Sequence, residues 1–296
     1  GESLVKGHFI GVHVPVAGFN IQLGDNFRYQ DPNRALWGVG VSYGYAMPLV
    51  LFTRENVAGK TLEQAAEVIR QNGKPTVQYA AQCHSTEPCS TEGALAMIHY
   101  MQDGYGAEIL DRINLIIVPR LSPDGSQLYQ RLLVNSINPN RDQLRVESPE
   151  MQAFQKGYLL FDPEVVLDGH ERNWNNQGGD IQVSTSFTPM NSDAWQATAL
   201  AMDQAAFREL ENNDLCGSYY SGAVNGYDPN MANAYFTTAG SLYVLMESRG
   251  IYGGNEAIER RVVAHMAAVE GILNYLHDNA GQVKAMVTAE REMFAQ

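Results

Sequence analysis

Cysteine is scarce in this chain, where three of the 296 residues are Cys. That number is too small for the disulfide framework that holds many small secreted domains together. Cys83 and Cys89 flank a turn and could form a single bridge, or both could be reduced packing residues, and the sequence leaves these alternatives open. A bridge would favour an oxidising compartment, periplasmic or secreted.

Long apolar runs and an excess of basic charge are missing too. No apolar stretch approaches the ~20 residues that cross a bilayer. The chain has 20 Lys and Arg against 33 Asp and Glu, which gives a formal net charge of −13, whereas binding to nucleic-acid phosphates needs clustered Lys and Arg. We therefore expect neither a membrane span nor a nucleic-acid partner. No internal repeat or low-complexity linker divides the chain.

Strand-like and helix-like stretches alternate along the chain. The runs 36–42 and 47–53 predict an antiparallel pair of strands. Thr61 and Gln64 predict a capping box at the start of a helix, and Ser122–Gly125 reads as a turn. Because strands and helices alternate, we expect an α/β fold with a mixed, mostly parallel sheet and helices on both faces.

Three apolar strands run directly into a candidate metal ligand or acid–base group. One leads to His84 and Glu87, a second to His170 and a third to Glu247. In an open α/β sheet, ligands collect beyond the carboxyl ends of the strands. Two histidines and one carboxylate around an open fourth position form a common catalytic zinc site. The apolar residues before Glu247 would raise its pKa towards that of a general base.

Six short motifs follow one another in a specific order. They are HSTEP at 84–88, SPDG at 122–125, Arg131, NR at 140–141, VVLDGHE at 165–171 and VLMESRG at 244–250. As a set they resemble the zinc metallocarboxypeptidases related to carboxypeptidase A, over roughly Leu36 to Tyr275. The resemblance implies a twisted sheet of about eight strands and one Zn²⁺ ion. It also implies a single catalytic domain over residues 36–296, preceded by an N-terminal extension over 1–35 whose role is left open.

The resemblance assigns roles to the residues of these motifs. His84, Glu87 and His170 resemble the zinc ligands of the family. Glu247 resembles its general base and acid. Arg131 resembles the arginine that stabilises the oxyanion of the tetrahedral intermediate.

Four further residues would contact the substrate if the resemblance holds. Asn140 and Arg141 resemble the pair that binds the terminal carboxylate of the substrate, for which a guanidinium fork is suited. Tyr220 is the first choice for the mobile tyrosine of the family, and Tyr227 is the second. Cleft-wall packing is the alternative role for both tyrosines.

Two positions depart from the family pattern. The family usually places an aspartate where this chain has Asn138, and that aspartate orients the first zinc histidine. We expect the amide oxygen of Asn138 to accept from His84 more weakly, at some loss of metal affinity or rate. Glu171, next to His170, is expected to orient that ligand or to bind a second cation.

The function that these residues predict is zinc-dependent cleavage of an amide bond beside a free carboxylate. The substrate would be a peptide or an acyl-amino acid with a free carboxylate. Two alternatives keep the same metal site: a deacylase of N-acyl amino acids and an amidase of cell-wall stem peptides. A third alternative is a non-catalytic binding module on the same fold. Glu247 separates the enzymes from the binding module, because binding alone needs no base there.

Overall fold

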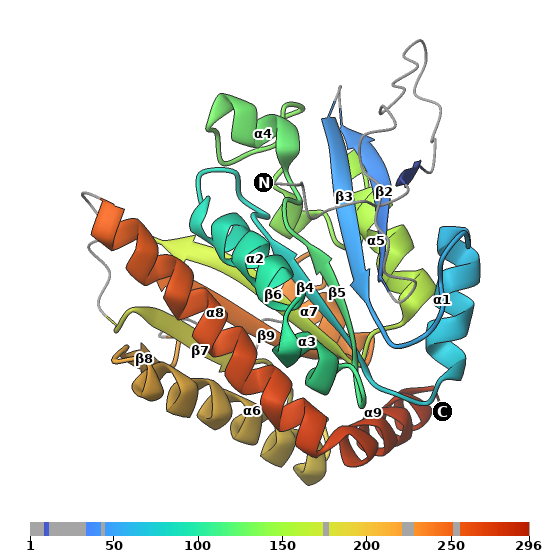
Figure 1. The fold of residues 1–296 in the computed structure, drawn as a ribbon. Helices are drawn as coiled ribbons and strands as arrows, with labels where there is room; N and C mark the ends of the chain where they lie inside the picture. Colours follow the sequence, from blue (N-terminus) through green and yellow to red (C-terminus); the bar gives the residue numbers. More distant parts are fainter. Residues whose placement is uncertain are drawn as a thin grey trace.

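The computed structural model describes residues 9–11, 34–42, 45–173, 178–220, 228–250 and 255–295. One sheet runs through the centre of the molecule (Figure 1). The nine strands of the described residues lie in the order β1-β2-β3-β5-β4-β6-β9-β7-β8. In chain order they are β1 (Phe9–Gly11), β2 (Arg34–Ser42), β3 (Tyr45–Phe52), β4 (Thr76–Ala81), β5 (Asn114–Val118), β6 (Val165–Arg172), β7 (Ile181–Thr185), β8 (Gly217–Ser218) and β9 (Leu242–Arg249).

The sheet is mixed and mostly parallel, as expected. β5, β4, β6 and β9 pair side by side in parallel, while the pairs β2–β3, β3–β5 and β7–β9 are antiparallel. The predicted antiparallel pair is confirmed, with Arg34 opposite Phe52 and Ser42 opposite Tyr45. The resemblance implied about eight strands, and the described residues form nine, of which β1 and β8 are only 3 and 2 residues long.

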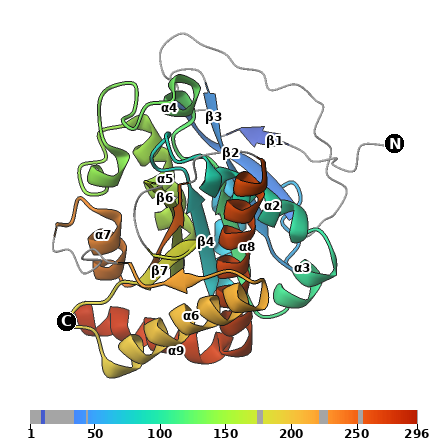
Figure 2. The same cartoon turned by 90° about the vertical axis from the view of Figure 1, so that its left-hand side faces the viewer.

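Helices cover both faces of the sheet. Every residue of β4 and β5 is therefore buried on one face or the other. The face called here the α8 face is covered by α2 (Cys89–Tyr100), α3 (Gly104–Ile109), α6 (Asp193–Asn212), α8 (Asn255–Asp278) and α9 (Ala280–Phe294). The opposite one, the α5 face, is covered by α1 (Leu62–Gln71), α5 (Pro149–Phe161) and α7 (Ala232–Thr238). In Figure 2, α5 and α7 lie to the left of the strands, and α2 and α8 lie to the right.

One of the two local signals read from the sequence gives the expected structure, and the other does not. The capping box of α1 forms, because Gln64 N donates to Thr61 Oγ1 at 3.2 Å and Thr61 N donates to Gln64 Oε1 at 3.0 Å. The expected turn at SPDG is wrong: Pro123 stands at the start of a short helix, α4 (Pro123–Leu128). Proline suits a first helical turn because the missing N–H would have had no partner there. After α4 the chain forms the short 3₁₀ turn η1 (Pro139–Arg141).

The segment before Leu36 contributes one strand to the edge of the sheet. β1 pairs in parallel with β2, with Phe9 opposite Leu36. The division into an extension over 1–35 and a domain over 36–296 stays a prediction. Among the described residues, no helix has the length and apolar character of a membrane span.

Candidate metal centre and active site

The loop after β4 brings two of the predicted zinc ligands to the carboxyl end of the sheet. The chain turns sharply at Gln82, whose φ of 56° lies in the left-handed region, which non-glycine residues rarely adopt. The Gln82 side chain holds this turn, with Nε2 donating to Ser85 O at 3.0 Å and Oε1 accepting from Thr91 Oγ1 at 2.8 Å. His84 and Glu87 follow, beside the end of β6, which pairs in parallel with β4.

The side chains of His84, Glu87 and His170 meet at one point. Their candidate ligand atoms all lie within 4.8 Å of one another, and all three residues are buried. Nδ1 of His84 lies 2.9 Å from Oε1 of Glu87, and Nδ1 of His170 lies 2.7 Å from Oε2 of the same carboxylate. Zinc forms bonds of about 2.0–2.2 Å to such atoms, so small side-chain rotations let the three share one ion. These residues fit a zinc site.

Each histidine contacts an oxygen on the far side of its ring. Nε2 of His84 lies 3.1 Å from Asn138 Oδ1, and Nε2 of His170 lies 3.0 Å from Asp168 Oδ2. With the Nε2 proton donated to these oxygens, each Nδ1 would present a lone pair to the common point, which is the tautomer that binding a metal through Nδ1 requires. Metal-binding histidines usually have an outer partner of this kind, which sets the tautomer and the ring orientation. The contact expected between Asn138 and His84 is present.

The charges of the site are strongly coupled. Burial alone would raise the pKa of Glu87, but His170 and His84 beside it hold this pKa well below its usual value. Burial alone would lower the pKa of His170, but Asp168 and Glu87 raise it well above its usual value. Burial lowers the pKa of His84. The Glu87 carboxylate therefore stays ionised and attracts positive charge.

Arg131 lies against the same carboxylate. Its Nη1 donates to Glu87 Oε1 at 2.7 Å, and 55% of its side chain is exposed. The helix α4, which precedes it, approaches the His84 loop closely at Gly125. A Cβ atom on Gly125 would lie 2.1 Å from Ser85 Oγ, so a side chain would push the two segments apart. This close approach explains the glycine of the SPDG motif.

Glu247 comes from the neighbouring strand. It lies directly opposite His170 in the parallel pair β6–β9, and adjacent strands are about 4.8 Å apart. Burial raises the pKa of Glu247, and the nearby Glu87 adds to this effect while His170 opposes it. Within the described residues, no side chain or amide donates a hydrogen bond to its carboxylate. Among the described residues, both oxygens of the Glu247 carboxylate are therefore available beside the candidate zinc ligands.

Asn140 and Arg141 lie in η1, close to the loop that carries Asn138. Oδ1 of Asn140 accepts from Ala232 N at 3.0 Å, and its NH₂ group has no acceptor among the described residues. Arg141 is exposed, and its Nη1 donates to Asn140 O at 2.7 Å. These two side chains present N–H donors at the edge of the site.

The structure places one of the two candidate tyrosines. Tyr220 N donates to Ser184 Oγ at 2.8 Å, and its half-buried ring packs against the core of the α5 face. Burial raises the pKa of Tyr220, and the proximity of Glu247 raises it further. Tyr227 lies outside the described residues. Tyr220 is therefore the candidate that the geometry brings near the site.

Comparison with known proteins places this site in a family. The model of the zinc carboxypeptidase family (Peptidase M14) matches residues 32–205, more than half of the chain. The chain belongs to the zinc carboxypeptidase family. The matched segment contains the candidate zinc ligands together with Arg131, Asn140 and Arg141, and it ends before Tyr220 and Glu247.

Individual members of the zinc carboxypeptidase family are distant relatives. Carboxypeptidase 2 of Trichophyton equinum is 21% identical over 232 residues, and carboxypeptidase 2 of Trichophyton rubrum is 27% identical over 232 residues. In both cases the match covers 68% of this chain but only 41% of the relative. The solved metallo-carboxypeptidase of Burkholderia cenocepacia has a TM-score of 0.67 at 18% identity, covering 85% of this chain and 67% of that one. This likeness confirms the carboxypeptidase-like fold.

Asp168 is a site residue that the sequence reasoning missed. Its Oδ2 also accepts from Tyr243 OH at 2.5 Å, so both the ring of His170 and a buried tyrosine hold it in place. The spacing of Asp168 from His170 was the available signal, since residues i and i+2 of a strand point to the same face.

Of the two alternatives for Cys83 and Cys89, a disulfide bridge or reduced packing residues, the structure shows the second. Cys83 and Cys89 are buried free thiols, and Cys216 is exposed and free. Burial raises the pKa of the Cys89 thiol to about 12. Buried thiols of this kind behave as small packing residues.

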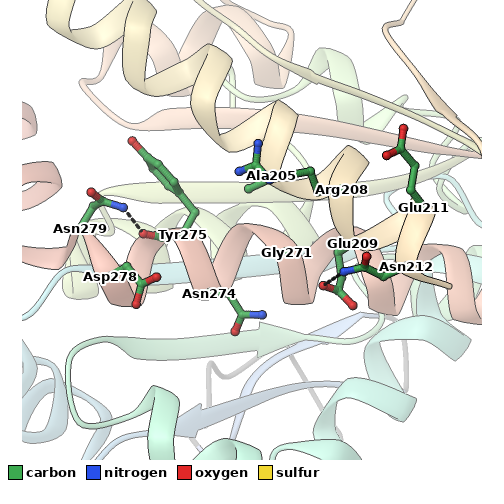
Figure 3. Close-up of a pocket in the computed structure, with 10 residues that line it drawn as sticks. All are labelled: Ala205, Arg208, Glu209, Glu211, Asn212, Gly271, Asn274, Tyr275, Asp278 and Asn279. Carbon is green, nitrogen blue, oxygen red and sulfur yellow. Dashed lines mark hydrogen bonds between the residues drawn. The ribbon is translucent and has the colours of Figure 1, made fainter.

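A cavity of about 520 Å³ lies away from this site, between α6 and α8 (Figure 3). Its lining is polar and includes Arg208, Glu209, Asn274, Tyr275 and Asp278. None of the residues predicted for the metal site lines it. The cavity therefore says nothing about the chemistry at the carboxyl ends of β4, β6 and β9.

Proposed function

We propose that this chain is a zinc-dependent hydrolase that cleaves an amide bond next to a free carboxylate. The observation that carries the proposal is the convergence of His84, Glu87 and His170, whose candidate ligand atoms lie within 4.8 Å of one another. Membership of the zinc carboxypeptidase family supports the choice of metal. Because the chain spans 41% of its curated relatives' length, the activity of the whole protein is part of this proposal.

Glu247 would move the protons of the reaction. When bound by His84, Glu87 and His170, zinc would polarise the scissile carbonyl and lower the pKa of a water molecule. Glu247 would take a proton from the attacking water and deliver it to the leaving amine nitrogen. Its raised pKa suits both steps, since a general base that later acts as an acid works best with a pKa near the working pH.

The remaining residues would position the substrate. Arg131, which already lies beside Glu87, would donate to the oxygen of the carbonyl under attack as negative charge develops. Arg141 and the NH₂ group of Asn140 would bind the free carboxylate of the substrate, because a guanidinium and a neighbouring donor can hold both of its oxygens. Tyr220 would close over the bound substrate.

The variant that tests this proposal is Glu247→Gln. Glutamine keeps the size of the side chain but cannot take a proton, so turnover should fall by about 10²–10⁴-fold while zinc stoichiometry stays unchanged. The matched control is Glu270→Gln on α8, another partly buried glutamate, which contacts Tyr100 rather than the site. Metal analysis and steady-state turnover on all three proteins are the measurements.

Turnover should be measured on three classes of substrate: peptides with a free carboxyl terminus, N-acyl amino acids and cell-wall stem peptides. Turnover on peptides with a free carboxyl terminus, lost when that terminus is amidated, supports the proposal. A parent chain that binds zinc but turns over none of these substrates would instead be a binding module. Equal turnover of the parent and Glu247→Gln would remove Glu247 from the mechanism.

A further inference from the structure

Glu171 points away from the metal site, although it directly follows His170. Successive residues of a strand face opposite sides of the sheet, so the Glu171 side chain lies on the α8 face. There its Oε1 is paired with Nη1 of Arg261, from α8, and its Oε2 accepts from Cys89 N at 3.2 Å. The Glu171 and Arg261 side chains are only 10% and 11% exposed. This is a largely buried ion pair behind the site.

Glu171 forms hydrogen bonds with both ends of the short segment from Glu87 to Cys89. Cys89 is the first residue of α2 and follows Glu87 by two positions. The carboxylate of Glu171 accepts from the amide of Cys89, where the positive end of the helix dipole favours a negative charge. The backbone amide of Glu171 donates to Oε2 of Glu87 at 3.3 Å. One residue of β6 thus contacts a metal ligand and the helix that begins beside it.

The packing between β6 and α2 is unusually close at this point. Gly169 has no side chain, and a Cβ atom there would lie 2.9 Å from the Cβ of Ser90 in α2. Because α2 can approach the strand this closely, the Glu171 carboxylate reaches the first amide of the helix directly.

We propose that Glu171, held in place by Arg261, is a positioning residue for the metal ligand Glu87. By fixing the start of α2 against β6, it keeps the Glu87 carboxylate within reach of His84 and His170. The sequence reasoning expected Glu171 to orient His170 or to bind a second cation. The contacts direct it to Glu87 instead, and Arg261 already supplies the cation. The inference rests on the zinc site proposed above.

A matched control exists at the other end of the same strand. Glu164 directly precedes β6; its Oε1 is paired with Lys284 Nζ, and its Oε2 accepts from Thr76 N at 2.6 Å. It therefore has the same two kinds of partner as Glu171, a cation and a backbone amide, far from the metal ligands. Glu171→Gln and Glu164→Gln should both lower the thermal midpoint, because each removes the carboxylate partner of a cation, the largely buried Arg261 or the half-buried Lys284.

Zinc affinity separates positioning from stability. We expect the zinc dissociation constant, measured by competition with a chromophoric chelator, to rise about 10–100-fold for Glu171→Gln and to stay at the parent value for Glu164→Gln. Arg261→Lys, which keeps the charge but loses the planar fork, should show a smaller rise and covers the case in which Glu171→Gln does not fold. In the Co²⁺-substituted proteins, the visible spectrum of Glu171→Gln and Arg261→Lys should shift, and that of Glu164→Gln should not.

Zinc binding by the variants and zinc binding by the parent chain answer different questions. If the folded Glu171 and Arg261 variants bind zinc as tightly as the parent, with an unchanged Co²⁺ spectrum, Glu171 has only a structural role and the inference is wrong. If the parent itself binds no zinc, the proposed function fails first.

Discussion

The two faces of β6 carry their charge in different ways at its carboxyl end. On the α5 face, Asp168 and His170 lie beside Glu247 and Glu87, and Arg131 is the arginine that pairs with this group of carboxylates. On the α8 face, Glu171 has its own buried cation, Arg261. Strand alternation separates His170 from Glu171, since the two residues occupy successive positions of β6.

The two faces differ in whether a side chain of the protein or a bound metal ion would supply the cation. On the α8 face, the Glu171 carboxylate has a guanidinium and a backbone amide as partners. On the α5 face, three carboxylates and two imidazoles gather at the carboxyl ends of β4, β6 and β9, and carboxylate and imidazole groups are the ligands that zinc takes. The carboxylate and imidazole groups on the α5 face are therefore the ones proposed to bind a metal, whereas Glu171 on the α8 face already has its cation.

The largest effect is expected for Asp203, a buried carboxylate whose partners include no cation among the described residues. It lies in α6 on the α8 face, 5% exposed, and accepts from Thr185 N at 3.0 Å and Thr185 Oγ1 at 2.6 Å. No cation pairs with it among the described residues, and burial raises its pKa to about 6. The folded protein therefore holds this proton more tightly than the unfolded chain, whose Asp pKa is about 3.9. The stabilisation that protonated Asp203 contributes should be greatest below pH 4 and be lost as the pH rises through 6.

The variant Asp203→Asn removes this titration. A difference of about two pKa units corresponds to about 3 kcal/mol, so from pH 4 to pH 7 the unfolding free energy of Asp203→Asn should rise by that amount relative to the parent. Urea unfolding at the two pH values measures it, with the exposed Asp278→Asn as the control. A constant difference between variant and parent at both pH values would contradict the raised pKa and weaken the contrast between the faces.

Parts of this arrangement follow from the sequence and parts do not. His84, Glu87, His170 and Glu247 could be grouped because parallel strands bring their carboxyl ends together, although their assignment to zinc and proton transfer remains a proposal. Arg261 could not be found, because it lies 90 positions from Glu171 and only the packing of α8 on the sheet joins them.

Among the helix starts, too, one could be predicted from the sequence and another could not. The capping box of α1 depends on residues three positions apart and was predicted. The helix α4 was not, because its stretch contains both Pro123 and Gly125, which are typical of a turn. Its glycine is required by contact with Ser85, a residue 40 positions earlier, and no local pattern carries that information.

Asp168→Asn sharpens the contrast within the α5 face. The amide can still accept from Nε2 of His170, but it lacks the negative charge that strengthens this hydrogen bond. Zinc should bind about 10–100-fold more weakly, as for other outer partners of metal ligands. Chelator competition measures the change. Asp203→Asn, the same substitution at a buried aspartate away from the metal site, should leave zinc affinity at the parent value, and equal losses in both variants would count against a specific role for Asp168.

Asn138→Asp should give the smallest effect, and in the opposite direction. Asn138 Oδ1 contacts Nε2 of His84 at 3.1 Å and also accepts from Asn140 N at 3.0 Å, and an aspartate can keep both contacts. The added charge would make His84 a stronger ligand, so zinc should bind up to about 10-fold more tightly. Asn135→Asp adds the same charge three residues earlier, where the side chain accepts from Ile137 N and does not contact His84. A gain at both positions would mean that zinc responds to the overall charge of the loop, whereas a gain at Asn138 alone would show that the hydrogen bond to the ligand carries the effect.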